Sequence, residues 1–148
     1  MRSGSRHWIV DGLRLERRDR ARALRALAWL VAAETAVRTL PFSTLRRWMD
    51  RVPPGRSTTQ SLTPSECRVA INRAARVFPA ARCLARALAA SCLLRRAGRV
   101  ATLSLGVCFD ADRRFAAHAW LECDGIAVTG GEESDRYVPL GVPAQKDA

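Results

Sequence analysis

The spacing of apolar residues changes near Val100, and this change limits the possible folds more than any other feature of the chain. Beyond it, apolar residues alternate with small or polar ones, which is typical of a β-strand with one covered face. The apolar positions are Leu103, Leu105, Val107 and Phe109, and the positions between them are Thr102, Ser104, Gly106 and Cys108. A second strand is predicted over Phe115–Cys123, and Asp124-Gly125 is a two-residue hairpin signal before a return strand over Ile126–Thr129. The last third of the chain is therefore predicted to form an antiparallel sheet.

Before Val100, the composition and the helix-end signals predict four helices. They are expected over Leu15–Leu40, Ser43–Arg51, Thr63–Phe78 and Cys83–Arg96. The clearest start is Thr63-Pro64-Ser65-Glu66, in which Thr63 is the N-cap and Glu66 completes a capping box. Helices followed by an antiparallel sheet indicate the α+β fold class.

The chain of 148 residues is long enough for one moderate core, and 48% of its residues are apolar. We expect a single compact domain in which residues 1–58 form an N-terminal helical segment packed on a core of residues 59–148. Arg14–Arg25 and Ala26–Ala33 together imitate a secretory signal, but the apolar stretch is too short to cross a bilayer and Glu34 ends it. This region is predicted to be an amphipathic helix rather than a transmembrane segment.

Charge is distributed unevenly along the chain. Residues 1–100 carry 21 basic and 6 acidic residues, a net charge of +15, whereas residues 101–148 carry 4 basic and 8 acidic residues, a net charge of −4. A basic half can attract nucleic acid, anionic lipid or an acidic peptide. No nucleic-acid partner is expected, because no helix-turn-helix, zinc-finger or RNA-binding signature accompanies the charge. The use of arginine at every basic position except Lys146 is typical of a GC-rich genome.

The spacing of the cysteines argues against a disulfide framework. The five cysteines are Cys67, Cys83, Cys92, Cys108 and Cys123. None belongs to a C-x-x-C pair, so no structural metal site is expected. Reduced thiols indicate a cytoplasmic protein, and the four cysteines other than Cys83 are predicted to be small core residues.

Cys83 and His118 form the candidate catalytic pair. Cys83 opens an apolar helical segment, and the free N–H groups and positive dipole end of a helix N-terminus stabilise a thiolate. His118 lies in the second predicted strand, and the only other histidine is His7 near the N-terminus. Imidazole is the usual base for a thiol nucleophile. From spacing alone, a packed thiol and a structural histidine remain an alternative interpretation.

The hairpin register predicts which acid orients the imidazole. With a two-residue turn, His118 faces Gly131, and Glu133 is a diagonal neighbour on the face of His118. Glu132 takes that position instead if a glycine bulge intervenes. Asp135, just beyond, is a further candidate, and a site without an orienting acid also stays open.

Two more residues share the predicted face of His118. Trp120 and Glu122 are assigned as candidate substrate-binding residues. The alternative for Trp120 is a core or wall residue, and the alternative for Glu122 is a carboxylate in solvent or the orienting acid itself.

Four strings of residues stand together in the second half of the chain. They are Cys83-Leu-x-Arg-Ala-Leu88, Leu93-Leu-Arg-Arg-x-Gly98, His118-Ala-Trp-Leu-Glu122-x-Asp-Gly125 and Tyr137-x-Pro-Leu140. Together they resemble the lasso-peptide biosynthesis B protein in its standalone leader-peptidase form, over about residues 60–140. The resemblance implies a papain/transglutaminase-like fold in which a helix packs on an antiparallel sheet. It also implies that Cys83 is the nucleophile and His118 the base. The family places an acid on the strand after the histidine, and this chain has Thr129-Gly130-Gly131 there, with Glu132, Glu133 and Asp135 just beyond.

The resemblance further implies a hydrolase that cuts the leader from a ribosomally made precursor and exposes the N-terminal amine of the core peptide. A separate ATP-dependent lasso cyclase would then join that amine to an Asp or Glu side chain. Leader recognition would belong to a small separate protein, since the length of this chain leaves no room for a fused recognition domain. The chemistry needs no cofactor and no metal.

Two other functions remain open. An acyl transferase of transglutaminase-like type would use the same thioester and differ only in transferring the acyl group to an amine instead of water. A non-catalytic module would use its basic helical half to dock a partner or an anionic membrane, and it should tolerate a modified Cys83.

Overall fold

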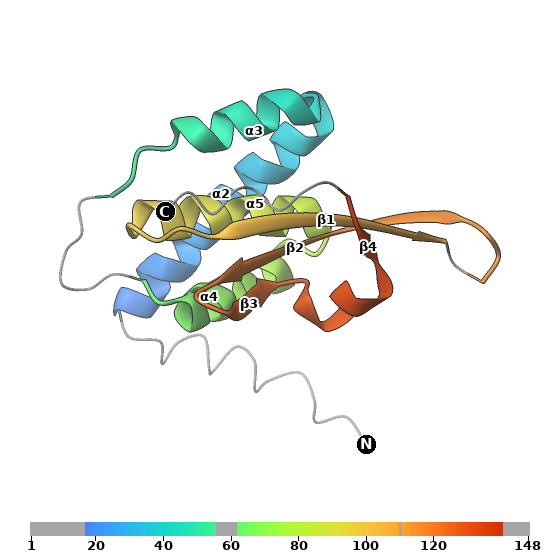
Figure 1. Cartoon of the computed structure of the whole chain (residues 1–148). Helices are drawn as coiled ribbons and strands as arrows, with labels where there is room; N and C mark the ends of the chain where they lie inside the picture. Colours follow the sequence, from blue (N-terminus) through green and yellow to red (C-terminus); the bar gives the residue numbers. More distant parts are fainter. Residues whose placement is uncertain (1–16, 56–61, 110, 141–148) are drawn as a thin grey trace, which may run out of the picture.

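The computed structural model of the chain describes residues 17–55, 62–109 and 111–140. The helices are α2 (Arg17–Thr39), α3 (Phe42–Arg51), α4 (Pro64–Val77), α5 (Cys83–Arg96) and the short 3-10 helix η1 (Gly131–Arg136). The strands are β1 (Thr102–Phe109), β2 (Phe115–Cys123), β3 (Ile126–Thr129) and β4 (Val138–Pro139). They form one antiparallel sheet in the order β3-β2-β1-β4 (Figure 1). The predicted α+β fold class, with helices followed by an antiparallel sheet, is confirmed.

α5 lies at the centre of the core. Together with α4 it packs against the sheet, and α2 crosses the other side of these two helices (Figure 1). Its buried residues are Ala85, Ala87, Leu88, Ala89, Ala90, Cys92, Leu93 and Leu94. Many of these side chains are small, so the neighbouring helices and strands approach α5 closely on several sides. This packing fixes the first residue of α5, Cys83, relative to the sheet.

The predicted start of α4 is confirmed. Thr63 Oγ1 accepts a hydrogen bond from the Glu66 backbone N–H at 3.2 Å, and Glu66 Oε2 accepts one from the Thr63 backbone N–H at 2.9 Å. These two bonds make a complete capping box, in which each residue satisfies a backbone donor of the other.

The other helix ends lie close to the predicted ones. α2 stops one residue before Leu40, and α3 starts one residue before Ser43. α2 packs on the domain as predicted and buries Ala26, Leu30 and Ala33 against α4 and α5. The predicted start of the first helix at residue 15 and the predicted boundary between residues 58 and 59 lie outside the described residues. Across the described ranges, we find no helix with both the length and the apolar character needed to cross a bilayer.

The predicted hairpin turn between β2 and β3 is also confirmed. Asp124 and Gly125 have φ angles of 53° and 74°, the left-handed values that a type I′ turn requires. Cys123 pairs with Ile126 across this turn. The first part of the predicted register is therefore correct.

Farther from the turn, the predicted register is wrong. The ladder between β2 and β3 shifts by one residue at Val128, and β3 ends at Thr129. Gly130, with φ of 69°, then turns the chain into η1. Because the strand ends first, Gly131 is not the strand partner of His118.

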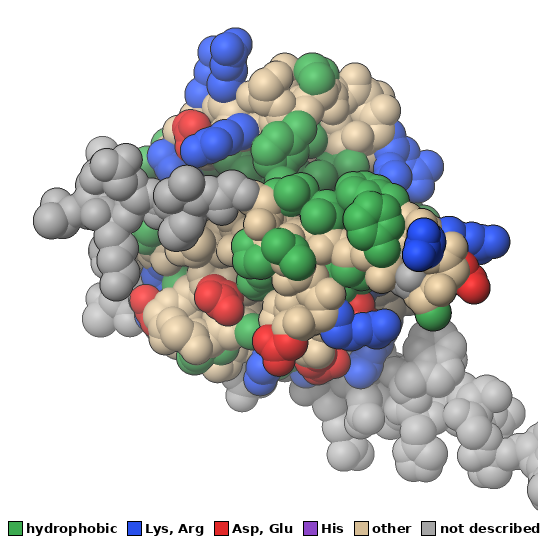
Figure 2. Space-filling view, turned by 45° about the vertical axis from the view of Figure 1, so that its right-hand side comes forward, with side chains coloured by type: hydrophobic (Ala, Val, Ile, Leu, Met, Phe, Trp, Pro, Cys, Tyr) green, Lys and Arg blue, Asp and Glu red, His purple; other side chains and the backbone are tan. Residues whose placement is uncertain are grey.

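The far end of the β1–β2 hairpin extends beyond the helices (Figure 1). Phe109 and Phe115 pair there edge to face, with ring centroids 6.1 Å apart, and both are exposed. Val138 and Leu140, in and beside β4, are exposed as well. Figure 2 shows hydrophobic side chains gathered on this side of the molecule, with basic and acidic side chains around them.

Candidate active site

Cys83 is the first residue of α5. Its N-cap residue, Arg82, makes no side-chain capping bond. The first backbone bond of the helix runs from the Arg86 N–H to the Arg82 carbonyl at 3.0 Å. The backbone N–H groups of the first turn, which precede Arg86, therefore have no partner within the helix. These donors can hold an oxyanion that forms beside Cys83.

The environment of Cys83 differs from that of three buried cysteines. Cys83 is half-buried, whereas Cys67, Cys92 and Cys123 are buried. Burial raises the pKa of the Cys67 and Cys92 thiols to about 12 each, so these two are unreactive at neutral pH. The prediction that Cys108 is also a core residue is wrong. It is half-buried, because it lies on the sheet face that the helices do not cover.

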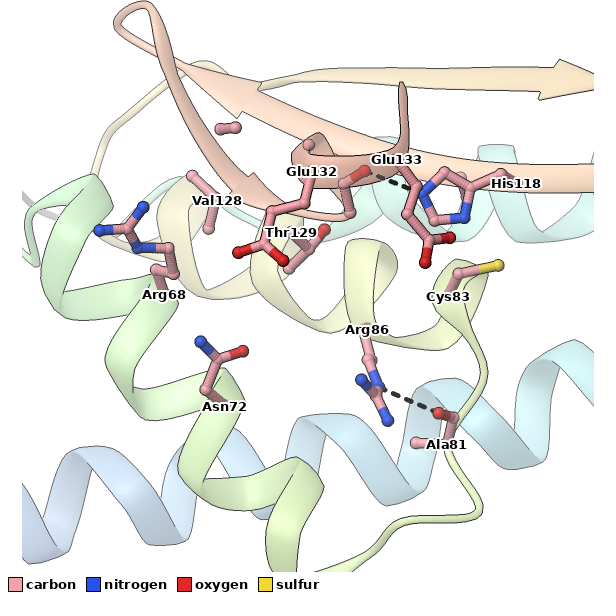
Figure 3. Close-up of a pocket in the computed structure, with 14 residues that line it drawn as sticks. Arg68, Asn72, Ala81, Cys83, Arg86, His118, Val128, Thr129, Glu132 and Glu133 are labelled. Atoms are coloured by element: carbon pink, nitrogen blue, oxygen red, sulfur yellow. Dashed lines mark hydrogen bonds between the residues drawn. The ribbon is translucent and has the colours of Figure 1, made fainter. Parts of the chain in front are cut away.

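His118 is oriented by a backbone carbonyl. Its Nε2 lies 2.8 Å from the carbonyl oxygen of Gly130. A carbonyl oxygen only accepts hydrogen bonds, so in the neutral imidazole Nε2 carries the proton and Nδ1 is bare. Figure 3 shows the second ring nitrogen directed toward Cys83. The arrangement thus aims an unprotonated nitrogen at the thiol.

Two aromatic rings support the imidazole. The ring centroid of His118 lies 4.9 Å from that of Tyr137 and 6.1 Å from that of Trp120, with interplanar angles of 27° and 20°. Gly106 lies opposite His118 in the sheet, and a Cβ there would lie 2.7 Å from Tyr137 Cβ and 2.8 Å from Trp120 Cζ3. A glycine at this position therefore allows both rings to pack beside the histidine.

Cys83 and His118 line the same pocket, which has a volume of about 490 Å³. Its walls come from α4, α5, β2, β3 and η1 (Figure 3). The charged and polar side chains that line it are Arg68, Asn72, Cys83, Arg86, His118, Thr129, Glu132 and Glu133. Cys83, His118 and Glu133 lie together at one end, and Arg68 and Asn72 lie at the other (Figure 3). A substrate that reaches the thiol would thus also meet basic and acidic groups.

Glu132 and Glu133 both line this pocket from η1. In Figure 3 the carboxylate of Glu133 points toward the end that holds Cys83 and His118, whereas that of Glu132 points away from them. Asp135, in the same short helix, is not among the lining residues. The Nε2 position, where an orienting acid would bind, is taken by the Gly130 carbonyl.

Trp120 and Glu122 do not line the pocket. Trp120 is only 7% exposed, and its ring packs over Gly106 and beside His118. Glu122 is exposed near the other end of β2, where it pairs with Thr102 of β1. The structure therefore groups Cys83, His118 and Glu133 but leaves these two residues outside the group.

Sequence reasoning missed two groups at the site, the Gly130 carbonyl and Arg86. The oxygen that orients His118 belongs to the backbone of Gly130, so no side-chain type identifies it in the sequence. The Thr129-Gly130-Gly131 segment is the only sequence feature at this position. Arg86 is fixed by a bond from its Nε to the Ala81 carbonyl at 3.0 Å, and it lines the pocket beside Cys83. Helical spacing from Cys83 would have found Arg86, because it lies one turn further along α5.

Among the described residues, no group of three or more His, Cys, Asp or Glu side chains is arranged to hold a metal ion. A family model described as the transglutaminase-like superfamily matches residues 27–142. The matched range covers most of the chain and includes both Cys83 and His118. Neither the search of curated proteins nor that of solved structures gave a match.

Proposed function

The chain belongs to the transglutaminase-like superfamily, and on this basis we propose that it is a cysteine peptidase that removes the leader peptide from a ribosomally made lasso-peptide precursor. The observation that carries the proposal is the pairing of a helix-start thiol with an imidazole whose bare nitrogen faces it. The superfamily includes cysteine peptidases and acyltransferases. The more specific assignment, to cleavage of a lasso-peptide precursor, is supported by the four strings of residues that resemble the lasso-peptide biosynthesis B protein.

The first half of the proposed reaction forms a thioester. His118 Nδ1 takes the proton of Cys83, and the thiolate attacks the carbonyl carbon of the bond between leader and core. The backbone N–H of Cys83 donates to the resulting oxyanion. The bond to nitrogen then breaks, and the imidazolium returns its proton to the leaving amine, which is the N-terminus of the core peptide. The leader stays attached to Cys83 through its C-terminal carbonyl.

The second half releases the leader. His118 removes a proton from a water molecule, which attacks the thioester carbonyl, and the thiolate leaves and is reprotonated. The products are a leader with a free carboxylate and a core peptide with a free amine. No metal or nucleotide takes part in these steps.

We assign the orientation of His118 to Gly130 and an electrostatic role to Glu133. The Gly130 carbonyl holds the proton on Nε2, which is the task of the third residue in a catalytic triad. Glu133 points its carboxylate to the same end of the pocket, where a negative charge would stabilise the imidazolium that forms after proton transfer.

Gly130→Ala tests the role of the carbonyl. Gly130 has φ of 69°, and a Cβ there would lie 2.6 Å from the Ala119 carbonyl oxygen and 2.8 Å from His118 Nε2. The added methyl group must displace the imidazole or the carbonyl, so we expect kcat to fall by at least about tenfold. Steady-state kinetics on the precursor measure this loss.

Gly125→Ala is the matched control. Gly125 has nearly the same φ, 74°, but a Cβ there has no neighbour within 4 Å. Its substitution should destabilise the fold by about 1 kcal/mol, as for any left-handed position, and should leave kcat unchanged. Equal kcat values for the Gly130→Ala and Gly125→Ala proteins would show that the carbonyl of Gly130 does not orient the base.

The proposed partners are the precursor leader, a small leader-recognition protein and an ATP-dependent lasso cyclase that acts on the released amine. The net charge of +15 on residues 1–100 supports a role in attracting an acidic leader or partner. We propose the cytoplasm as the location, because ribosomally made precursors first appear there and the chain has free cysteines.

Mass spectrometry of the reaction products tests the proposed function. The purified chain, a precursor peptide and the leader-recognition protein are incubated in water enriched with a heavy oxygen isotope. A peptidase adds one labelled oxygen to the carboxylate of the leader. An acyl transferase, which the superfamily also includes, instead gives an adduct when a primary amine is present. An intact precursor under all conditions would rule out both enzymes and favour a binding module.

A further inference from the structure

Glu34 is the one buried charged residue among those that the structure describes. It lies on α2, is 2% exposed and ends the row of apolar residues that faces α4 and α5. Burying a carboxylate costs free energy unless hydrogen bonds and opposite charges compensate it. Its contacts therefore need an explanation beyond core packing.

Both carboxylate oxygens of Glu34 bind the residue that precedes Cys83. Oε2 accepts a hydrogen bond from the Arg82 backbone N–H at 3.1 Å, and Oε1 accepts one from Arg82 Nε at 3.3 Å. Oε1 also accepts a bond from Arg38 Nε at 2.8 Å. Arg82 is the N-cap residue of α5, so a side chain of α2 holds the start of the helix that begins with Cys83.

The carboxylate of Glu34 is charged at neutral pH. Burial raises its pKa, but the hydrogen bonds from Arg38 and Arg82 and the charge of Arg82 outweigh burial, so the pKa lies below its usual value. The Arg38 and Arg82 side chains are 56% and 59% exposed. The arginines thus reach solvent while the carboxylate remains inside. Such a pair adds little net stability but fixes geometry.

Apart from the buried side chains of Ala81 and Ala85 and the bond from Arg86 to the Ala81 carbonyl, the start of α5 has few other restraints. Arg82 makes no side-chain capping bond, and the residues just before it form a turn and irregular backbone after Phe78. A single backbone bond, from the Ala81 N–H to the Phe78 carbonyl at 3.3 Å, is found in that connection. The two hydrogen bonds from Arg82 to Glu34 therefore add a polar link from α2 to the apolar packing that holds the first turn of α5.

We propose that Glu34 is a positioning residue for Cys83. By holding the Arg82 backbone it sets where α5 begins, and so where the thiol lies relative to the imidazole of His118. The catalytic consequence rests on the proposed peptidase function. The positioning role itself does not rest on that function, because it concerns only where the thiol lies relative to its surroundings.

Comparing Glu34→Gln with Glu34→Leu separates the effect of the hydrogen bond to the Arg82 backbone from the effect of the carboxylate charge. Both substitutions remove the charge and keep a side chain of similar size, but only glutamine retains an oxygen that can accept the Arg82 N–H. Each substitution removes only one partner of the ion pairs, but the Arg38 and Arg82 side chains are more than half exposed and can turn to solvent, so no buried charge is left unpaired. Glu34→Met serves the same comparison if Glu34→Leu does not fold.

Two rates are compared between these variants. The first is kcat for leader cleavage, and the second is the rate at which iodoacetamide labels Cys83, measured by peptide mapping. We expect both rates to be at least about tenfold lower in Glu34→Leu than in Glu34→Gln, with unchanged KM, because a misplaced thiol loses near-attack geometry and thiolate stabilisation. Cys67 and Cys92, which are buried, should stay unlabelled in both variants and so report an intact fold.

Glu66 provides the matched control. It also accepts a hydrogen bond from an N-cap backbone N–H, that of Thr63, and pairs with Arg22 at 2.8 Å, but it caps α4 instead of α5. Glu66→Leu and Glu66→Gln should give the same two rates as the unmodified chain. Equal rates in Glu34→Leu and Glu34→Gln would overturn the proposal. If the unmodified chain does not cleave the precursor, the proposed function fails, and the labelling rates alone decide the role of Glu34.

Discussion

Cys83→Ala is expected to abolish leader cleavage and leave the fold intact. The thiolate is the only group of the protein that forms a covalent bond with the substrate in the proposed mechanism, and alanine offers no nucleophile. Cys83 is half-buried at a helix start, and alanine is the best helix former, so little packing is lost. Product analysis by mass spectrometry measures cleavage, and a thermal unfolding curve checks the fold.

Cys108→Ala is the appropriate control for this substitution. Cys108 is also half-buried, but it lies on β1 and does not line the pocket. Its replacement should keep substantial activity. Cleavage by the Cys83→Ala protein at the rate of the unmodified chain would show that the thiol is not the nucleophile and would remove the basis for a cysteine peptidase.

Local signals in the sequence determine much of the fold. The capping box at Thr63 and Glu66 and the turn at Asp124 and Gly125 each depend on residues within a few positions of one another. The alternation of apolar residues after Val100 is likewise a local property, and β2 has the predicted bounds Phe115–Cys123. Such features can be predicted because neighbouring residues alone satisfy the backbone groups concerned.

Features that depend on distant contacts were not predictable. β4 has two residues, Val138 and Pro139, and exists because they pair with Val107 and Gly106 of β1. The shift at Val128 likewise arises from how β3 meets β2. No pattern within a two-residue strand or a single bulged residue marks either feature, because tertiary contacts stabilise them.

The site itself was predictable in part. The structure brings Cys83 and His118 into one pocket, and it adds Glu133 and Glu132 from η1. Helix-start chemistry and the rarity of histidine were sufficient to select the first two residues. The Gly130 carbonyl could not be selected, since every residue has a carbonyl and only the tertiary structure determines which one meets His118.

Glu34 illustrates the same limit for a side chain. In the sequence it ends an apolar run and resembles the polar boundary of an amphipathic helix. Its partner, Arg82, is 48 residues away in the chain. A carboxylate that acts across such a separation becomes recognisable only when the helices that carry the two residues are packed together.

His118→Ala is expected to lower kcat by at least about 10²-fold, the usual effect of losing a general base. His118 is the one histidine in the described part of the chain, and its bare Nδ1 faces Cys83. Removing the ring leaves the thiol without a proton acceptor and the leaving amine without a donor. Single-turnover cleavage of the precursor measures the loss, and Asp135→Asn, a change in η1 outside the pocket lining, is the control.

Added imidazole distinguishes a lost base from a damaged fold. Tyr137 and Trp120 form one wall of the space that the His118 ring fills, so a free imidazole can enter the gap in the His118→Ala protein and accept the proton there. We expect it to restore part of kcat, with a pH dependence that follows the pKa of the added base. If the His118→Ala protein cleaves normally without imidazole and keeps the pH profile of the unmodified chain, another group is the base, and the hydrogen bond from His118 to Gly130 is purely structural.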